Sequence, residues 1–345
     1  MRFGVPYQGS KNKIAEWVID NLPEDEILVD LFAGGCAVTH AAMLSGKWNK
    51  VIANDIGDAP ELFCDAIDGK YADEKRWISR EDFQNLKDTD PYVSLCWSFG
   101  NNRTDYLYAQ EIEPWKKALH YARVFGDCSL LQEMGIDSDG SSADIRNHHD
   151  EYKEKYIRWW LSKQKHIFLA SNKLITNDKL NIKENKDKCG QYFISSLKKS
   201  ELKSIEKLQR LQRLQSLGSL ERLESLESLE SLEKYKNNLT ITRKNYSDVA
   251  IPDNAVVYAD PPYKGTNIEG YKCDFDYAAF EKWLNEVPFM VIVSEYNAPA
   301  GCVEIASIKK QVTLGTGNKG RTNTEKLFVQ KRFYNEYLQK MGRLL

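Results

Sequence analysis

The sequence predicts an α/β protein with a mostly parallel sheet that is interrupted by a long, largely helical insertion. Near the start of the chain, short apolar runs alternate with helical patterns, which is typical of a parallel sheet. Between residues 58 and 238 the chain is more polar and the strand signal is lost. It returns after residue 238, so two distant segments are expected to build one sheet.

The first unit of that sheet is predicted as strand, helix, strand and helix. Ile27–Phe32 is an apolar run bounded by a glycine pair, as expected of a buried strand. Ala37–Ser45 is predicted to be a helix, Lys50–Asn54 a second strand and Ala59–Ile67 a second helix. A unit of this kind begins a doubly wound parallel sheet.

The remaining elements lie near the end of the chain. Strands are expected at Leu239–Arg243, Ala255–Ala259, Phe289–Val293 and Glu325–Lys331, and a helix at Asp276–Glu286. Residues 1–57 and 239–345 are therefore predicted to form one domain, which residues 58–238 interrupt as an insertion.

The composition excludes several classes of protein. The 345 residues are 42% hydrophobic and 11% aromatic, which is enough to bury a large core. A net charge of −2 excludes a chain that is basic throughout, although a local basic surface could still bind nucleic acid. The apolar stretch 27–44 is broken by polar residues and glycines, so no membrane span is expected. Seven dispersed cysteines without a CxxC pair indicate a cytoplasmic protein without a structural metal site.

The strongest functional signal is Asp260-Pro261-Pro262-Tyr263, which follows the predicted strand Ala255–Ala259. The prolines end the strand and fix the backbone, so a carboxylate and an aromatic ring are held at the carboxyl end of a strand, where such sheets bind ligands. The alternative is a strand-ending turn capped by an aspartate.

This motif suits methylation of an exocyclic amine. The lone pair of such a nitrogen is delocalised into the ring, so the nitrogen is a poor nucleophile. The Asp260 carboxylate and the Pro261 carbonyl could accept hydrogen bonds from both amino hydrogens and stabilise the positive charge that develops during attack. Tyr263 could stack on the base.

A second signal is the strand-to-helix turn Asp30–Cys36, which contains Gly34 and Gly35. Glycines let a ligand approach the backbone, although the pattern does not match the dinucleotide fingerprint GxGxxG. Asp55 ends the second strand, where a ribose diol is commonly held; it could also cap the following helix. A weaker third signal is the N-terminal loop, which carries Tyr7 and Lys11.

Together, these motifs resemble the Dam-type DNA adenine-N6 methyltransferases, in the order of that family. The resemblance implies a Rossmann-like methyltransferase domain, S-adenosylmethionine as the cofactor, and double-stranded DNA from which the target adenine is flipped out. Asp260, Pro261, Pro262 and Tyr263 would hold that adenine. The cofactor site would comprise Tyr7, Lys11, Asp30, Phe32, Ala33, Gly34, Gly35, Asp55, Asn245 and Tyr246. One departure is Cys36, which replaces the last glycine of the family's Phe-x-Gly-x-Gly turn.

Contacts with DNA are predicted in two regions. The segment Gly100–Arg103 with Tyr106 resembles the part of the family that contacts target bases, so Asn101, Asn102, Arg103 and Tyr106 are candidates. A polar loop on an aromatic core is the alternative. Lys319, Arg321 and Lys326 lie in a basic region around a glycine-rich loop that could bind phosphates.

Two other functions remain open. The Asp-Pro-Pro-Tyr motif also serves cytosine-N4 methylation, and digestion of a methylated duplex to nucleosides would separate the two products. A DNA-binding protein that uses this fold without turnover is the rival from another class. Transfer of a labelled methyl group to DNA would exclude it.

A low-complexity segment, residues 197–236, carries leucine at every third position from Leu208 to Leu232. Three residues of an α-helix fall about 60° short of a full turn, so these leucines would encircle an α-helix. The segment is therefore predicted to project from the domain rather than build its core. A leucine-lined helix that shapes the DNA cleft is the alternative.

Overall fold

The computed structural model describes residues 2–163, 218–263, 275–311 and 322–343. The chain divides into two compact units. Unit 1 consists of Met1–Glu74, Arg80–Asp105 and Arg222–Leu345, and unit 2 of Lys75–Ser79 and Tyr106–Glu221. Parts of the predicted insertion 58–238 thus pack with the sheet. The division of labour between a catalytic and a recognition part stays a prediction.

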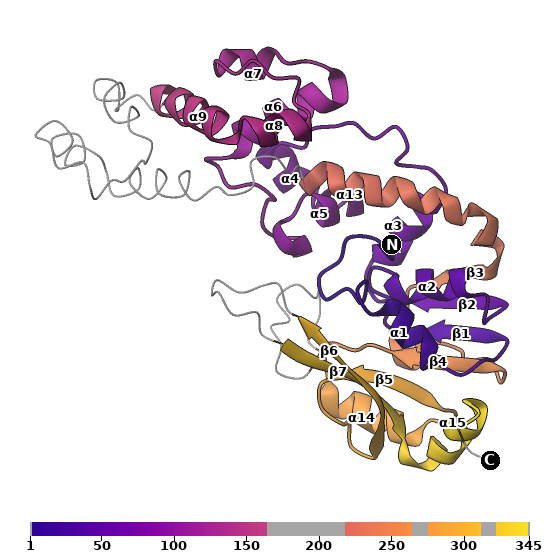
Figure 1. Cartoon of the computed structure of the whole chain (residues 1–345). Helices are drawn as coiled ribbons and strands as arrows, with labels where there is room; N and C mark the ends of the chain where they lie inside the picture. Colours follow the sequence, from indigo (N-terminus) through magenta and orange to yellow (C-terminus); the bar gives the residue numbers. More distant parts are fainter. Residues whose placement is uncertain (1, 164–217, 264–274, 312–321, 344–345) are drawn as a thin grey trace, which may run out of the picture. The chain divides into compact units, whose positions relative to one another are not determined.

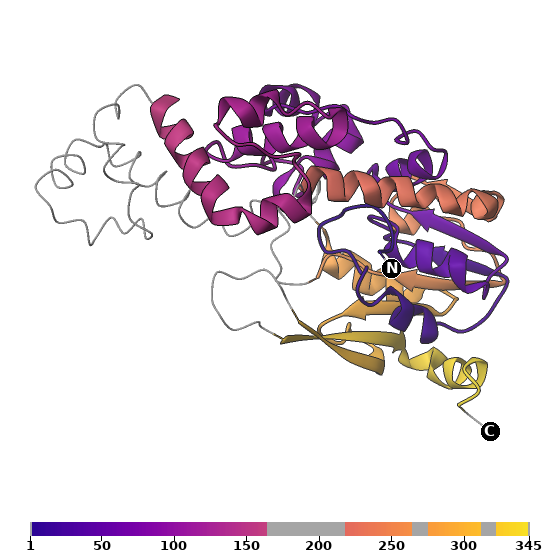
Figure 2. The ribbon, with the colours of Figure 1, turned by 45° about the horizontal axis from the view of Figure 1, so that its top comes forward.

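Unit 1 contains a seven-stranded sheet with the strand order β3-β2-β1-β4-β5-β7-β6 (Figures 1 and 2). The strands are β1 (Ile27–Asp30), β2 (Lys50–Asn54), β3 (Leu239–Thr242), β4 (Ala255–Ala259), β5 (Val291–Glu295), β6 (Cys302–Gln311) and β7 (Thr322–Gln330). The first five strands pair in parallel, whereas β7 runs antiparallel to both β5 and β6. The predicted mostly parallel, Rossmann-like sheet is confirmed.

The strand order fixes where a ligand can bind. From β1 the chain proceeds outward to β2 and β3, and it then returns to β4 on the other side of β1. The connections therefore leave β1 and β4 in opposite directions, which opens a crevice at the carboxyl ends of these strands. Both Asp30 and Asp260 lie at these ends.

The strand β6 was missed by the sequence prediction. Its pairing with β7 shifts register between Glu304 and Ala306, so Ile305 forms a β-bulge. A bulge adds one residue and breaks the alternation of apolar and polar side chains by which strands are recognised. β6 is also an edge strand, a position where polar and charged residues such as Lys309 are favoured.

Helices cover the sheet of unit 1. They are α1 (Ala15–Asp20), α2 (Ala37–Ser45), α3 (Ala59–Ile67), α4 (Arg80–Leu86), α5 (Pro91–Cys96), α14 (Tyr277–Glu286) and α15 (Tyr334–Lys340), with short 3-10 helices η1 (Phe99–Asn101), η3 (Tyr246–Asp248) and η4 (Lys331–Phe333). Phe280 and Leu284 of α14 pack on alternate residues of β1, β4 and β5, such as Val29, Val257 and Val293. This packing holds the central strands rigidly beneath the crevice.

The leucine triplets contradict the prediction of a projecting segment, as far as they are described. The α-helix α13 (Gly218–Glu227) continues directly into the 3-10 helix η2 (Ser228–Asn238). Leu223, Leu226, Leu229 and Leu232 are all buried. Leu223 and Leu226 are buried on the α-helix α13. In η2, a 3-10 helix with three residues per turn, Leu229 and Leu232 share one face, and η2 packs against α3 and α2. For η2, the prediction was wrong because it assumed α-helical geometry throughout. The triplets from Leu208 to Leu217 lie outside the described residues.

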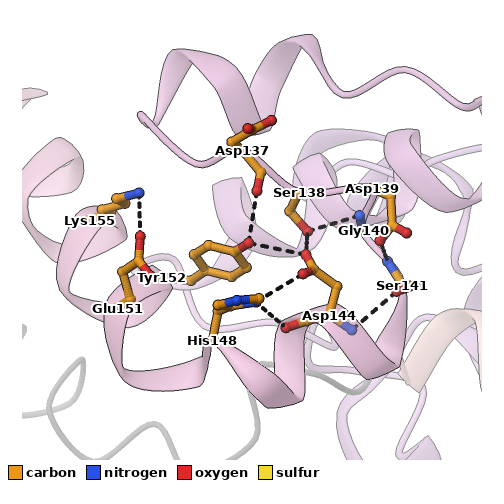
Figure 3. Close-up of polar contacts among 10 residues, drawn as sticks. All are labelled: Asp137, Ser138, Asp139, Gly140, Ser141, Asp144, His148, Glu151, Tyr152 and Lys155. Carbon is orange, nitrogen blue, oxygen red and sulfur yellow. Dashed lines mark hydrogen bonds and ion pairs between the residues drawn. The ribbon is translucent and has the colours of Figure 1, made fainter.

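Unit 2 is helical, with α6 (Glu113–Phe125), α7 (Ser129–Glu133), α8 (Ser142–Asn147) and α9 (His149–Lys163). Asp144 in the first turn of α8 joins two of these helices to the preceding loop (Figure 3). Its carboxylate accepts hydrogen bonds from Ser138 and from Tyr152 of α9, and it lies 2.9 Å from Nδ1 of His148. Ser141 caps α8 by accepting the Asp144 amide N–H. A satisfied polar network of this kind rigidifies the loop that precedes α8.

Within the part of the chain that the structure describes, no helix has the length and apolar character needed to cross a membrane.

Candidate active site

A pocket opens at the carboxyl ends of β1, β2 and β4. The N-terminal loop, the turn after β1, the end of β2 and the segments after β3 and β4 contribute to its wall. The predicted site residues in that wall are Tyr7, Lys11, Asp30, Phe32, Ala33, Gly34, Gly35, Asp55, Asn245, Tyr246, Asp260 and Pro262. The structure thus brings together motifs from both ends of the sequence. Pro261 and Tyr263 are buried directly beside them.

The turn after β1 needs glycines for steric reasons. A Cβ atom added at Gly34 would lie 2.9 Å from the ring of Tyr7, and one at Gly35 would lie 2.6 Å from the Tyr7 Cβ. Cys36 adopts a φ of 60°, in the left-handed region that favours glycine, and precedes the first residue of α2. The substitution of cysteine for glycine therefore keeps a glycine-like backbone at this position.

Asp55 connects this turn to the end of β2. Its carboxylate accepts the Gly34 amide N–H at 2.9 Å and the Gly57 amide N–H at 2.7 Å. Burial raises the pKa of Asp55, while these two hydrogen bonds and the nearby Arg103 guanidinium oppose that rise. Each carboxylate oxygen has a second lone pair, so Asp55 can also accept hydrogen bonds from a ligand in the pocket.

Asp30 is the most deeply buried acid of the pocket, with 1% of its surface exposed. Its Oδ2 atom accepts the Thr39 hydroxyl at 2.8 Å, whereas Oδ1 has no hydrogen-bond partner among the described residues. Burial raises the pKa of Asp30 to about 7. The hydroxyl of Tyr258, also in the pocket wall, is buried and lies near Ser294. Buried polar groups are normally hydrogen-bonded, so Asp30 Oδ1 indicates a polar ligand.

The opposite side of the pocket is aromatic. The ring of Phe32 lies 5.4 Å from that of Tyr246 and 5.8 Å from that of Phe275, measured between centroids. The side chain of Asn245 accepts the Ser247 amide N–H and thereby caps η3, which fixes Tyr246 at the pocket. Such a surface suits a flat, apolar ring.

Asp260 takes part in a buried ion-pair cluster. The Nζ atom of Lys11 lies 2.8 Å from Asp260 Oδ1 and 3.2 Å from Glu325 Oε1. Burial raises the pKa of Asp260; Lys11 lowers it and Glu325 raises it further. The two carboxylates also raise the pKa of Lys11, which stays protonated although it is buried.

Tyr263 belongs to the same cluster. Its hydroxyl donates to Glu325 and lies 2.9 Å from the Ser294 hydroxyl. Its ring carries Lys11 Nζ at 4.5 Å from the centroid on one face, and Tyr296 packs edge-on at 4.6 Å. The predicted stacking of Tyr263 on a base would therefore require Lys11 to move.

The side chains predicted to contact bases are engaged within the protein. The Asn101 amide donates to the Leu95 carbonyl, the Asn102 amide to Asp105, and Arg103 forms an ion pair with Asp58. Tyr106 is 6% exposed, and its hydroxyl donates to the Ile78 carbonyl. Contact of these residues with DNA stays a prediction and would require them to exchange partners.

Of the three predicted phosphate-binding residues, the structure describes only Lys326. Lys319 and Arg321 lie outside the described residues. Lys326 is on β7, where its ammonium forms an ion pair with Glu304 at 2.9 Å.

Glu325, Ser294 and Tyr258 were not predicted from the sequence. Strand alternation could have found two of them, because every second side chain of a strand lies on the same face. Tyr258 lies on β4, two residues before Asp260, so the two side chains are expected on the same face. Glu325 lies on the same face of β7 as Leu327 and Val329, because the three residues are spaced by two. Leu327 and Val329 are fully buried, so this face is the interior one.

The sheet order, the glycine turn and the Asp-Pro-Pro-Tyr motif at the end of β4 define the class as a Rossmann-like methyltransferase fold. Residues 7–125 match the family model of the D12 class N6 adenine-specific DNA methyltransferases, which confirms the resemblance found in the motifs. The Type II methyltransferase M2.HphI of Haemophilus parahaemolyticus is 47% identical to the chain over 53 residues. This similarity spans 15% of the chain and 15% of that relative. Asp260 and Tyr263 lie beyond the family match.

Proposed function

We propose that this protein transfers a methyl group from S-adenosylmethionine to the N6 amino group of adenine in double-stranded DNA. The observation that carries the proposal is that Asp260 and the glycine turn after β1 line the same pocket. A donor held at the turn and an amine held at Asp260 would therefore meet in one cavity. The family match over residues 7–125 supports the choice of adenine.

The donor side fits the chemical groups of S-adenosylmethionine. Asp30 presents an unpartnered carboxylate oxygen that suits a cationic ammonium group, and the Tyr258 hydroxyl offers a further polar contact. Asp55 can accept from a ribose diol, and Phe32 and Tyr246 can contact an adenine ring. Bound there, the cofactor supplies a methyl group on a positively charged sulfur.

The acceptor side activates the amine. The Asp260 carboxylate and the Pro261 carbonyl accept the two amino hydrogens, which favours the tetrahedral nitrogen and stabilises its developing positive charge. The nitrogen would form one bond to the methyl carbon as the bond from that carbon to sulfur breaks, so that the sulfur leaves as a neutral thioether, and the nitrogen would lose one proton. Burial raises the pKa of Asp260, so its carboxylate is suited to take that proton. The two prolines hold the motif rigidly during this step.

Adenine N6 can reach a buried carboxylate only if the base leaves the helical stack. The DNA therefore has to be held by surfaces outside the pocket. Lys319, Arg321 and Lys326 are proposed to contact phosphates, and Asn101, Asn102, Arg103 and Tyr106 to contribute to base recognition.

The direct test is methyl transfer with a labelled cofactor, followed by digestion of the DNA to nucleosides. We expect label in N6-methyl-2′-deoxyadenosine with the wild-type protein and none with Asp260→Ala. Label in N4-methyl-2′-deoxycytidine would show that the target is cytosine instead of adenine. Absence of label in DNA, with a folded protein that binds both cofactor and DNA, would refute the proposal.

A further inference from the structure

Glu325 is an acid in the interior of the active-site region. It lies on β7 with 2% of its surface exposed. Oε1 is 3.2 Å from Lys11 Nζ and 3.2 Å from the Ser294 hydroxyl, and it accepts the Tyr263 hydroxyl. A buried carboxylate is costly unless it is paired, so its place between Lys11 and Tyr263 requires an explanation.

Lys11 occupies the position that the substrate amine has to take. Its Nζ atom is 2.8 Å from Asp260 Oδ1, where the amino group would donate, and it lies over the face of Tyr263, where the base would stack. The amine can therefore donate to Asp260 Oδ1, and the base can stack on this face of Tyr263, only when Lys11 withdraws. If Lys11 withdrew into apolar surroundings, an ammonium group would be left buried and unpaired, which is strongly unfavourable.

We propose that Glu325 is a positioning residue for methyl transfer, which holds the Lys11 ammonium and the Tyr263 hydroxyl so that Asp260 can exchange Lys11 for the amine. This inference rests on the proposed function. Because Glu325 already touches Lys11, the exchange needs only a small rotation of the lysine side chain, and its charge stays paired throughout. The Tyr263 ring is held in place by the same carboxylate while one of its faces is uncovered.

The electrostatics agree with this role. Lys11 alone would pull the pKa of Asp260 down and weaken it as an acceptor for a proton, whereas Glu325 acts in the opposite direction. A lysine that is shared between two carboxylates thus binds each of them less firmly than it would bind a single carboxylate.

Glu325→Gln tests the charge and leaves the shape. Glutamine is isosteric and can still accept the Tyr263 hydroxyl, so packing and hydrogen bonding are retained while the charge is lost. With cofactor and DNA both saturating, we expect kcat to fall on the order of tenfold to a hundredfold, because Lys11 then remains on Asp260. The acid limb of the kcat–pH profile should move to lower pH by about one unit, because Lys11 then lowers the pKa of Asp260 unopposed.

A structural role alone would not move the pH profile. Glu325→Asp retains the charge and should recover part of kcat and return the acid limb toward its wild-type position. The matched control is Asp25→Asn, which removes a carboxylate from the ion pair between Asp25 and Lys340 on the same unit, and should leave kcat unchanged. Wild-type kcat and an unmoved acid limb in Glu325→Gln would overturn the inference. If the wild-type protein itself transfers no methyl group to DNA, the proposed function fails instead.

Discussion

The two halves of the pocket differ in how their buried polar groups are satisfied. On the side of β1, Asp30 Oδ1 has neither a hydrogen-bond partner nor an ion-pair partner among the described residues. Beyond β4, Asp260 and Glu325 share the Lys11 ammonium, and Tyr263 is bonded to Glu325. A ligand gains most binding free energy where it supplies a missing hydrogen-bond partner, and it gains less where it must replace an existing partner. The first half therefore suits tight binding of a polar ligand, and the second half suits the proposed exchange of Lys11 for the amine.

The largest effect is expected from Asp260→Ala, which removes the acceptor on the second half. Methyl transfer should fall by at least about a thousandfold, because the developing charge on the nitrogen loses its carboxylate. Cofactor affinity, measured by calorimetry, should stay within about tenfold of wild type. A folded variant that no longer binds the cofactor would show that the two halves are not separate.

Asp30→Asn addresses the first half. We expect cofactor affinity to fall about tenfold to a hundredfold, because a charged hydrogen bond is lost in a buried site. In the wild-type protein affinity should also fall about tenfold for each pH unit below 7, since protonated Asp30 cannot pair with a cation. The variant should lack this dependence. Parallel pH profiles for both proteins would remove Asp30 from the cofactor site.

The raised pKa of Asp30 also predicts how the stability of the ligand-free protein depends on pH. Its pKa is raised from 3.8 in the unfolded reference to about 7 in the fold, so the folded state disfavours ionisation. The free energy of unfolding should therefore decrease as the pH rises from about 4 to about 7. Thermal melting of wild type and Asp30→Asn over this range measures the difference, and equal pH dependence in both would contradict it.

Asp55→Ala is expected to lower the affinity for the cofactor and to leave the affinity for DNA unchanged. Loss of an acceptor from a buried diol costs about 1–3 kcal/mol, which corresponds to roughly fivefold to a hundred and fifty-fold in affinity. A melting curve has to accompany the binding measurement, because Asp55 also accepts the Gly34 and Gly57 amides. Wild-type cofactor affinity in the variant would remove Asp55 from the site.

The smallest effect is expected from Thr39→Val, which is nearly isosteric. The Thr39 hydroxyl lowers the pKa of Asp30, so its removal should raise that pKa. The midpoint of the pH dependence of cofactor binding should then rise by about 0.5–1 pH unit. An unchanged midpoint would mean that another group governs the dependence.

Local sequence patterns predicted the central elements well, because the buried positions of these elements follow the spacing of apolar residues in the sequence. The bounds of α2, β2, α3 and β4 agree with the predicted ranges. The strand β5 begins and ends two residues later than predicted, since its last residues, Ser294 and Glu295, are polar yet buried. Apolar periodicity cannot reveal a strand end that carries polar residues toward a site.

The motifs also indicated most of the pocket wall, but they could not indicate its pairings. Lys11, Asp260 and Glu325 are far apart in sequence and belong to the N-terminal loop, the end of β4 and β7. Only the assembled sheet places one lysine between two carboxylates. Cooperation between such residues depends on tertiary structure, and no single segment carries its signature.

The 3-10 helix η2 has a consequence for how the chain can change. In an α-helix, one inserted Ser-Leu-Glu triplet would rotate every later side chain by about 60° away from its partners. In η2 the same triplet advances the chain by about 6 Å along the axis with no rotation, because three residues complete one turn. The leucines added or removed with each triplet therefore stay on the buried face, so the segment between α13 and β3 can change length by whole turns without rotating its leucines toward solvent.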